Sequence, residues 1–242
     1  LDLEKSVDYN LPRTMIDRLT LTPSRIALMA EGVRQVAALE SPVGSIIETI
    51  TRPNGLIIEK RSVPFGVIGI IFEARPNVTV DIASLCLKSG NACVLRGGKE
   101  AIHSNRILVQ IINEAIQDVL PTHTVTLIET KKREETLDLI QAHDYVDVII
   151  PRGSAGLIQY VVKNATVPVI ETGAGICHLY VDQDASLDMA LEIAKNAKIQ
   201  RPSVCNAIET ILVHQKVAQE FLPKLQEIFK NVQIYGDEKT RK

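Results

Sequence analysis

One cysteine of this chain stands in a setting that could support covalent chemistry. Cys205 lies in a polar, proline-broken stretch, residues 200–206, between a helical pattern and an apolar strand pattern. The remaining cysteines lie in or beside apolar runs: Cys86, Cys93 and Cys177. A buried cysteine behaves as a small hydrophobe, whereas a loop thiol near a cation can ionise to a nucleophilic thiolate. Because Arg201 is close in sequence, Cys205 is a candidate nucleophile, with an incidental loop cysteine as the equally weighted alternative.

Two loops of small residues could receive phosphate groups. Arg96-Gly97-Gly98-Lys99 follows a strand pattern and precedes a helical one, and Arg152-Gly153-Ser154-Ala155-Gly156 repeats this arrangement. Glycine lets the backbone approach a phosphate closely, and the N-terminus of a helix favours an anion. The first loop is neither a GxGxxG nor a Walker A sequence, so an ordinary turn with two solvated cations explains it equally well. Two such loops on neighbouring strands fit a dinucleotide, which carries a pyrophosphate.

Two further polar residues are candidates for a site. Glu171 ends a strand pattern and could be a general base, although a solvated turn residue is the slightly better explanation. The side-chain amide of Asn77 could donate a hydrogen bond to a developing oxyanion. Its place just before a helical pattern is more simply explained as a helix N-cap.

Composition excludes several classes of function. The net charge of −2 gives no reason to expect nucleic acid or an anionic membrane as partner. The chain has no Trp, and its aromatic share of 4% argues against recognition by stacking. No apolar run reaches the roughly 18 residues that span a bilayer. The histidines show no metal-ligand spacing with the cysteines, and His178 is expected to pack in the core. Scattered cysteines without a disulfide framework indicate a reduced, cytoplasmic protein.

The residues before position 62 predict a helix and a β-hairpin. Residues 22–39 have helical apolar spacing, with Thr22 as a candidate cap and Pro23 in the first turn. Pro53-Asn54-Gly55 is a turn signal between two short apolar segments, residues 45–50 and 56–60. A two-stranded ribbon is not stable alone, so we expect it to lie on another domain or subunit.

The rest of the chain alternates between strand and helix patterns. Strands are expected at 65–72, 91–95, 124–128, 146–150 and 167–170, and helices at 78–88, 104–119, 133–142 and 155–163. Beyond Glu171 a second α/β unit is expected, with strands at 178–181 and 207–213 and helices at 187–198 and 216–230. This alternation predicts parallel sheets covered by helices, with ligands at the carboxyl ends of the strands.

Five segments spread over nearly the whole chain form a specific combination of motifs. They are Val63–Asp81, Leu87–Glu100, Ile150–Leu157, Val167–Gly173 and Gln200–Asn206. Together they resemble the gamma-glutamyl phosphate reductase family, within the aldehyde dehydrogenase superfamily. The resemblance implies an α/β fold with a Rossmann-like cofactor domain, residues 1–44 and 63–171. It also implies a bridging, oligomerising β-ribbon, residues 45–62, and the N-terminal part of an α/β catalytic domain, residues 172–242.

The resemblance assigns roles to the candidate residues. It places Cys205 as the nucleophile and Asn77 as the oxyanion-hole amide, in preference to the capping role. It places Arg96 where the superfamily has a lysine that meets the adenosine ribose, and Glu171 where hydrolytic aldehyde dehydrogenases keep their general base. Together with the two small-residue loops, the expected cofactor-binding residues are Arg96, Gly97, Gly98, Lys99, Gly153, Ser154 and Glu171. Arg201 is implied to hold the phosphate or carboxylate of the substrate, and no metal is needed. Because Lys99 stands where NAD-preferring relatives often carry a glutamate, a 2′-phosphate and hence NADPH are favoured.

The implied reaction is the NADPH-dependent reduction of glutamyl 5-phosphate to glutamate 5-semialdehyde by a homo-oligomer. Aldehyde oxidation through the same cysteine is the alternative within enzymes, and it predicts that Glu171 is essential. A non-catalytic cofactor-binding or oligomerisation module is the alternative outside them. Compared with the superfamily, the chain is expected to begin within the N-terminal helices and to stop before a later cofactor-contacting Glu-Phe segment and the last bridging strand.

Overall fold

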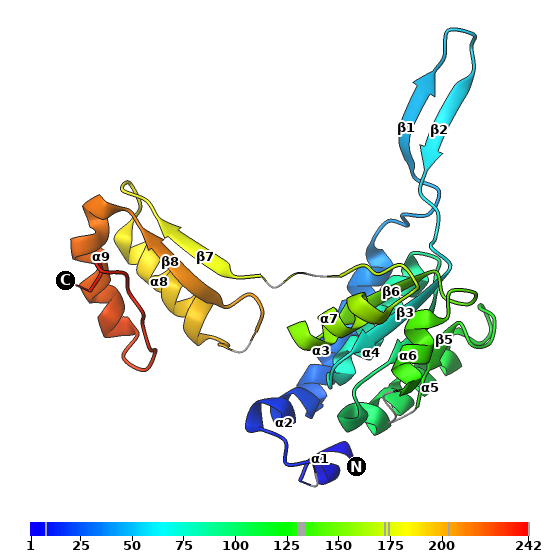
Figure 1. Cartoon of the computed structure of the whole chain (residues 1–242), viewed down its shortest axis with the longest axis horizontal. Coiled ribbons are helices and arrows are strands. Elements are labelled where there is room, and N and C mark those ends of the chain that lie inside the picture. Colours follow the sequence, from blue (N-terminus) through cyan, green and yellow to red (C-terminus); the bar gives the residue numbers. More distant parts are fainter. Residues whose placement is uncertain (8, 130–133, 172, 174, 203, 242) are drawn as a thin grey trace. The chain divides into compact units, whose positions relative to one another are not determined.

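The computed structural model describes all residues except 8, 130–133, 172, 174, 203 and 242 (Figure 1). The chain divides into two compact units, Leu1–Gly173 and Ala174–Lys242. The division falls close to Glu171, where the sequence pattern changes. Each unit has a parallel sheet and helices packed on it, which confirms the predicted α/β class.

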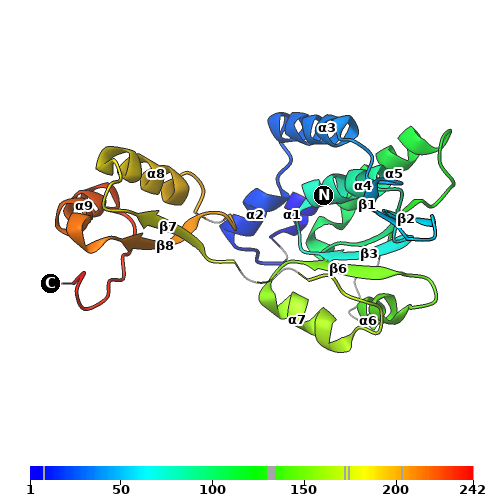
Figure 2. The same ribbon diagram turned by 90° about the horizontal axis from the view of Figure 1, so that it is seen from above.

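The first unit contains a four-stranded parallel sheet in the order β5-β4-β3-β6. Its strands are β3 (Val67–Phe72), β4 (Ala92–Arg96), β5 (Val125–Leu127) and β6 (Val148–Arg152). The helices that follow them are α4 (Pro76–Lys88), α5 (Ile102–Ile116), α6 (Glu134–Gln141) and α7 (Ala155–Asn164). Helices α4 and α5 lie on one face of the sheet, and α6 and α7 lie on the other (Figure 2).

The two faces of the sheet bury separate apolar cores because side chains alternate along a strand. Ile68, Ile70 and Phe72 of β3 pack with α4 and α5. Ile71, between them, packs with α6 and α7. Strands buried on both faces read as continuous apolar runs, which is why the sequence pattern located them.

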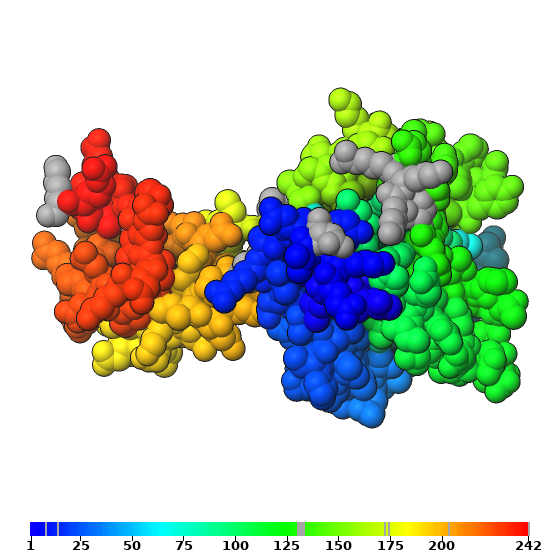
Figure 3. Space-filling view, turned by 90° about the horizontal axis from the view of Figure 1, so that it is seen from below, coloured from blue at the N-terminus to red at the C-terminus, as the bar shows by residue number. Residues whose placement is uncertain are grey.

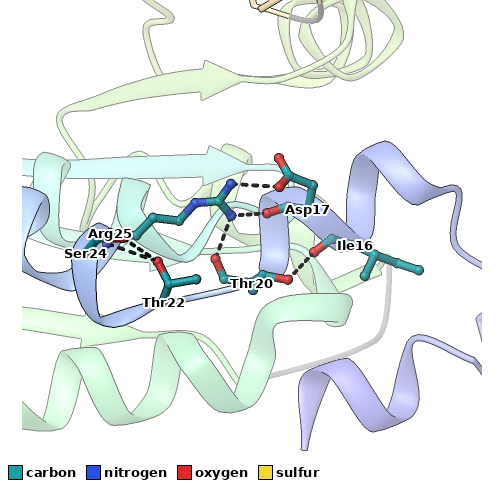
Figure 4. A network of polar contacts seen from close by, with 6 residues as sticks. All are labelled: Ile16, Asp17, Thr20, Thr22, Ser24 and Arg25. Atoms are coloured by element: carbon teal, nitrogen blue, oxygen red, sulfur yellow. Dashed lines mark hydrogen bonds and ion pairs between the residues drawn. The ribbon is translucent and has the colours of Figure 1, made fainter.

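The N-terminal segment adds three helices to this unit, α1 (Asp2–Lys5), α2 (Arg13–Leu19) and α3 (Pro23–Ala38). Helix α3 packs on α4. Helix α1 lies against α5, where dark blue meets green in Figure 3. The Thr22 hydroxyl accepts a hydrogen bond from the Arg25 backbone N–H at 3.2 Å, which confirms the predicted cap (Figure 4). The Arg25 guanidinium also donates to the Asp17 carboxylate at 2.7 Å and to the Thr20 carbonyl at 2.8 Å, joining α2 to α3.

The predicted hairpin is present as β1 (Ile46–Thr51) and β2 (Ile57–Arg61), paired antiparallel (Figure 1). Gly55 has φ +86°, the left-handed conformation that this tight turn requires and that glycine adopts without strain. Every residue of both strands is exposed. The ribbon therefore has no core of its own within this chain.

The second unit contains β7 (Cys177–Val181) and β8 (Ile208–Val213), paired in parallel, with helices α8 (Leu187–Ile199) and α9 (Gln215–Ile228). Its core includes Val181, Leu191, Ile208, Phe221 and Leu225. The predicted strand at 167–170 is reduced to one parallel bridge, between Ile149 and Val169. The pattern gave no signal for α1 and α2.

Candidate active site

Three loops of the first unit meet at the carboxyl edge of its sheet. They follow β4, β3 and β6, which lie in that order in the sheet. The prediction that the two small-residue loops follow neighbouring strands is wrong, because β3 lies between β4 and β6. A Cβ on Gly98 would lie 3.0 Å from the backbone nitrogen of Ala74, so the β4 loop lies directly against the β3 loop. A Cβ on Gly153 would lie 2.7 Å from the Glu73 side chain, so the β6 loop closes on the β3 loop from the other side. This edge is the expected ligand site of a parallel α/β sheet.

The Arg96–Lys99 turn fits an anionic ligand. Arg96 is partly buried at the end of β4, and Lys99 is exposed at the start of a short 3-10 turn, Lys99–Ala101. The Lys99 ammonium lies over the ring of Tyr9, 5.0 Å from its centroid, within the range of a cation–π contact. Gly97 is buried, and a Cβ there would collide with the Asn105 amide and come within 3.1 Å of Phe72. The two glycines therefore let this turn approach both the neighbouring loop and the core.

The Arg152–Gly156 loop already holds an anionic group. The backbone N–H of Ser154, at the start of α7, donates to the Glu73 carboxylate at 2.7 Å. The Glu73 backbone N–H donates to the Arg152 carbonyl at 3.2 Å, which extends the β3–β6 ladder by one bond. The rule that ligands bind at the carboxyl ends of parallel strands points to the loop that begins at Glu73, but the sequence patterns gave the Glu73 side chain no role.

Asn77 lies inside α4 and does not cap it. Arg75 is the N-cap and Pro76 the first helical residue, so the capping interpretation is wrong. The Asn77 side-chain nitrogen donates to the Asp81 carboxylate at 3.0 Å. A carboxylate only accepts hydrogen bonds, so Asp81 fixes the NH₂ end of the amide and leaves its second N–H for another acceptor. The spacing of four residues on one helix face was the sequence signal for this pair.

Cys205 is the exposed cysteine of this chain, in the loop between α8 and β8. Its backbone carbonyl accepts a hydrogen bond from the Cys177 thiol at 3.5 Å, which ties the loop to the start of β7. Next to Cys205, the Val204 N–H donates to the Arg201 carbonyl at 3.3 Å, which brings the backbones of Val204 and Arg201 together. Cys205 and Arg201 belong to the second unit, and Asn77 and the cofactor loops belong to the first.

The other cysteines are poorly placed for nucleophilic chemistry. Cys86 and Cys93 are buried, and Cys177 is partly buried. The hydrogen bond with Cys86, and then burial, raise the pKa of the Cys93 thiol far above its ordinary range. That thiol therefore stays protonated, as expected of a core cysteine.

The remaining predictions about polar residues have mixed outcomes. Glu171 is exposed near the end of the first unit. His178 is exposed and contacts the Ile176 carbonyl at 2.7 Å, so the prediction that it packs in the core is wrong. Among the described residues, no group of three or more His, Cys, Asp or Glu side chains is arranged to hold a metal ion. None of the helices in the described part of the chain has the length and hydropathy to cross a bilayer.

The second unit contains a hollow of about 880 Å³. It is bordered by β8, α9 and the segment after α9, including Leu212, Leu222, Phe229 and Tyr235. None of the predicted site residues lines it. The candidate chemistry is therefore carried by loops rather than by this hollow.

The chain thus combines two α/β units. The first has small-residue loops at the carboxyl edge of its sheet, and the second has an exposed loop cysteine. Residues 20–242 match the aldehyde dehydrogenase family. The chain belongs to the aldehyde dehydrogenase family.

Particular members of the family are similar to this chain along nearly its whole length. The chain is 54% identical to the gamma-glutamyl phosphate reductase of Enterococcus faecalis and 56% identical to that of Moorella thermoacetica, in each case over 99% of this chain. It spans 58% of the length of these two relatives. The crystal structure of gamma-glutamyl phosphate reductase from Thermotoga maritima superposes with a TM-score of 0.91 at 45% identity, covering 99% of this chain and 59% of that one.

Proposed function

We propose that the protein containing this chain reduces L-glutamyl 5-phosphate to L-glutamate 5-semialdehyde with NADPH and releases phosphate, a step of proline biosynthesis. The observation that carries the proposal is the identity of 54–56% to gamma-glutamyl phosphate reductases along 99% of the chain. The exposed Cys205 and the three converging loops supply the groups that this reaction needs. All four cysteines are free thiols, in keeping with a reducing, cytoplasmic setting.

In the proposed mechanism Cys205 carries the covalent step. Its thiolate attacks the acyl carbon of glutamyl 5-phosphate, phosphate leaves, and a thioester remains on Cys205. The amide of Asn77 and the backbone N–H of Cys205 donate to the oxyanion that forms in this attack. Arg201 holds the phosphate or a carboxylate of the substrate by charge-assisted hydrogen bonds.

Family membership implies a nicotinamide cofactor, and the residues at the carboxyl edge fit one. Arg96, Lys99 and the close approach at Gly98 suit an anionic dinucleotide, as do Gly153 and Ser154 at the start of α7. The chemistry that a bound cofactor supplies is the hydride for reduction of the thioester. Water is not activated in this direction, so Glu171 is not needed as a base.

A comparison of substrates tests the proposed activity. The protein containing this chain should use glutamate 5-semialdehyde with phosphate and NADP⁺, the reaction run backwards, at a higher kcat/KM than propionaldehyde with coenzyme A. Propionaldehyde is chosen because a propionaldehyde dehydrogenase shares this fold at 21% identity. A preference for propionaldehyde would reject the proposed substrate and leave the fold and the cysteine chemistry in place.

Lys99→Glu is expected to remove or invert a preference for NADPH over NADH. The 2′-phosphate of NADPH carries about −1.5 to −2 charge at neutral pH. A charge-assisted hydrogen bond from a lysine to this phosphate contributes roughly 1.5–3 kcal/mol to the binding free energy of NADPH. The wild-type preference is therefore roughly ten- to a hundredfold. The measurement is kcat/KM for both cofactors in wild type and variant. The kcat at saturating cofactor should hardly change in the variant. An unchanged ratio of the two kcat/KM values would show that Lys99 faces solvent.

We propose that the β1–β2 ribbon mediates homo-oligomerisation. It exposes apolar side chains on a two-stranded structure that is not stable alone, including the cross-strand pair Ile50 and Ile58. Ile58→Asp is expected to lower the oligomeric mass measured by light scattering. Asn54→Asp at the exposed turn is the matched control, because it adds the same charge without removing apolar surface. An equal mass for both variants and wild type would place the subunit contacts elsewhere.

A further inference from the structure

The crevice between β3 and β6 is the topological switch point of the first sheet. The chain runs from β3 outward to β4 and β5, and then crosses back to place β6 on the other side of β3. The loops after β3 and β6 therefore leave the sheet in opposite directions, which opens a crevice at their carboxyl ends. Ligands of doubly wound sheets bind in this crevice.

The Glu73 side chain lies at this switch point, against the loop that follows β6. Its carboxylate accepts the Ser154 N–H at 2.7 Å, at the first turn of a ten-residue helix. Ser154 makes no side-chain cap of its own to α7. The β6 loop is shaped around the carboxylate, since a Cβ on Gly153 would lie 2.7 Å from the Glu73 Cδ and 2.9 Å from its Oε1. Glu73 thus serves as the N-terminal cap of a helix that it reaches from a different strand.

A cofactor phosphate and this carboxylate compete for the same position. The N-terminus of a helix stabilises one anion through its free N–H groups and its dipole. Two anions held at hydrogen-bond distance from the same N–H repel each other. Binding of a pyrophosphate at Gly153 and Ser154 therefore requires Glu73 to leave the Ser154 N–H.

We propose that Glu73 is a displaceable internal ligand that lowers the affinity of the protein for its dinucleotide cofactor. This inference rests on the proposed function, because it takes the β6 loop as the pyrophosphate site. Glu73 caps α7 and keeps the loop in its binding conformation while the site is empty. The cofactor must then replace a charge-assisted hydrogen bond before it gains its own, and the same competition speeds its release.

Glu73→Gln tests the proposal by separating charge from shape. Glutamine still accepts the Ser154 N–H through Oε1, but the bond is neutral and weaker. The dissociation constant of NADPH, read from the cofactor's own fluorescence, should fall roughly tenfold in the variant. Because the chain has no Trp, this emission is free of tryptophan signal from these residues. The matched control is Glu114→Gln on the exposed face of α5, which removes the same charge and should leave the dissociation constant unchanged.

Two further binding measurements distinguish displacement of Glu73 from a general effect on cofactor binding. Adenosine 2′-phosphate lacks the pyrophosphate, so its affinity should be equal in wild type and Glu73→Gln. Glu73→Asp keeps the charge but shortens the side chain, so it should also bind NADPH more tightly, and it serves if the glutamine variant does not fold. Unchanged or weaker NADPH binding in either Glu73 variant would overturn the inference and make Glu73 a permanent cap. Failure of wild type and all variants to bind NADPH would instead reject the proposed cofactor.

Discussion

Cys205→Ala is expected to abolish phosphate-dependent reduction of NADP⁺ with glutamate 5-semialdehyde, a loss on the order of 10⁴- to 10⁶-fold in kcat. The cause is the loss of the nucleophile that forms the thioester, a role that a neighbouring group does not replace. Cys86 and Cys93 are buried in the sheet core, and Cys177 is engaged with the Cys205 carbonyl. The measurement is the initial rate of cofactor reduction at saturating aldehyde and phosphate.

The control for this variant is Cys86→Ala in the core of the first unit. It removes a buried sulfur and leaves a small cavity, so it should lower the melting temperature and preserve kcat. Near-wild-type activity of Cys205→Ala would reject the covalent mechanism. Loss of activity in Cys86→Ala as well, without unfolding, would contradict the purely structural role given to Cys86. The loss in Cys205→Ala would then not identify Cys205 as the nucleophile.

Asn77→Ala is expected to lower kcat by on the order of 10²-fold, the usual effect of removing one oxyanion donor. The structure excludes capping as the competing explanation, because Arg75 is the N-cap of α4 and Asn77 lies within the helix. The substrate KM should change much less, since the hydrogen bond strengthens as negative charge develops on the oxygen. Steady-state kinetics together with a thermal melt separate the two effects.

Two neighbouring variants sharpen this experiment. Asp81→Asn removes the carboxylate that fixes the Asn77 amide, so it should lower kcat by less than Asn77→Ala does. Ser84→Ala, whose hydroxyl donates to the Asp81 backbone carbonyl on the same helix, should leave kcat unchanged. A fall in melting temperature with normal kcat for Asn77→Ala would restrict Asn77 to a structural role.

The sequence predicted the elements of the fold because each element carries a local signal. Continuous apolar runs such as Val67–Phe72 mark strands buried on both faces. Thr22 before Pro23 marked the start of α3, and Gly55 marked the turn of the hairpin. These signals depend only on residues next to one another, so pattern reasoning detects them.

Contacts between distant residues account for what the patterns missed. Helix α5 begins at Ile102 rather than Ser104, and the Asp2 carboxylate accepts the backbone N–H groups of His103 and Ser104 at 3.1 and 2.7 Å. This cap comes from a helix about a hundred residues earlier in the chain. Likewise, Glu73 at the end of β3 reaches the Ser154 loop at the end of the neighbouring strand β6, 81 residues later in the chain, which no local spacing reveals.

Among the site residues, too, local signals were predicted from the sequence and contacts between distant residues were missed. Cys205 stood out because a proline-broken polar loop is an unusual place for a cysteine, and the structure leaves it exposed. Asn77 looked like a cap because it precedes an apolar helical pattern, but Pro76 fixes the helical φ one residue earlier. The Lys99–Tyr9 contact depends on how the N-terminal segment folds back, so sequence reasoning found the lysine and not its partner.

The phosphate dependence of the reverse reaction tests the central claim most directly. The protein containing this chain would be given glutamate 5-semialdehyde and NADP⁺, with phosphate either present or rigorously removed. The account predicts continuous NADPH formation with phosphate and at most one turnover per site without it, because only phosphate releases the thioester from Cys205. Continuous, phosphate-independent formation of NADPH and glutamate would contradict it, since water would then release the thioester and the protein would be a hydrolytic aldehyde dehydrogenase.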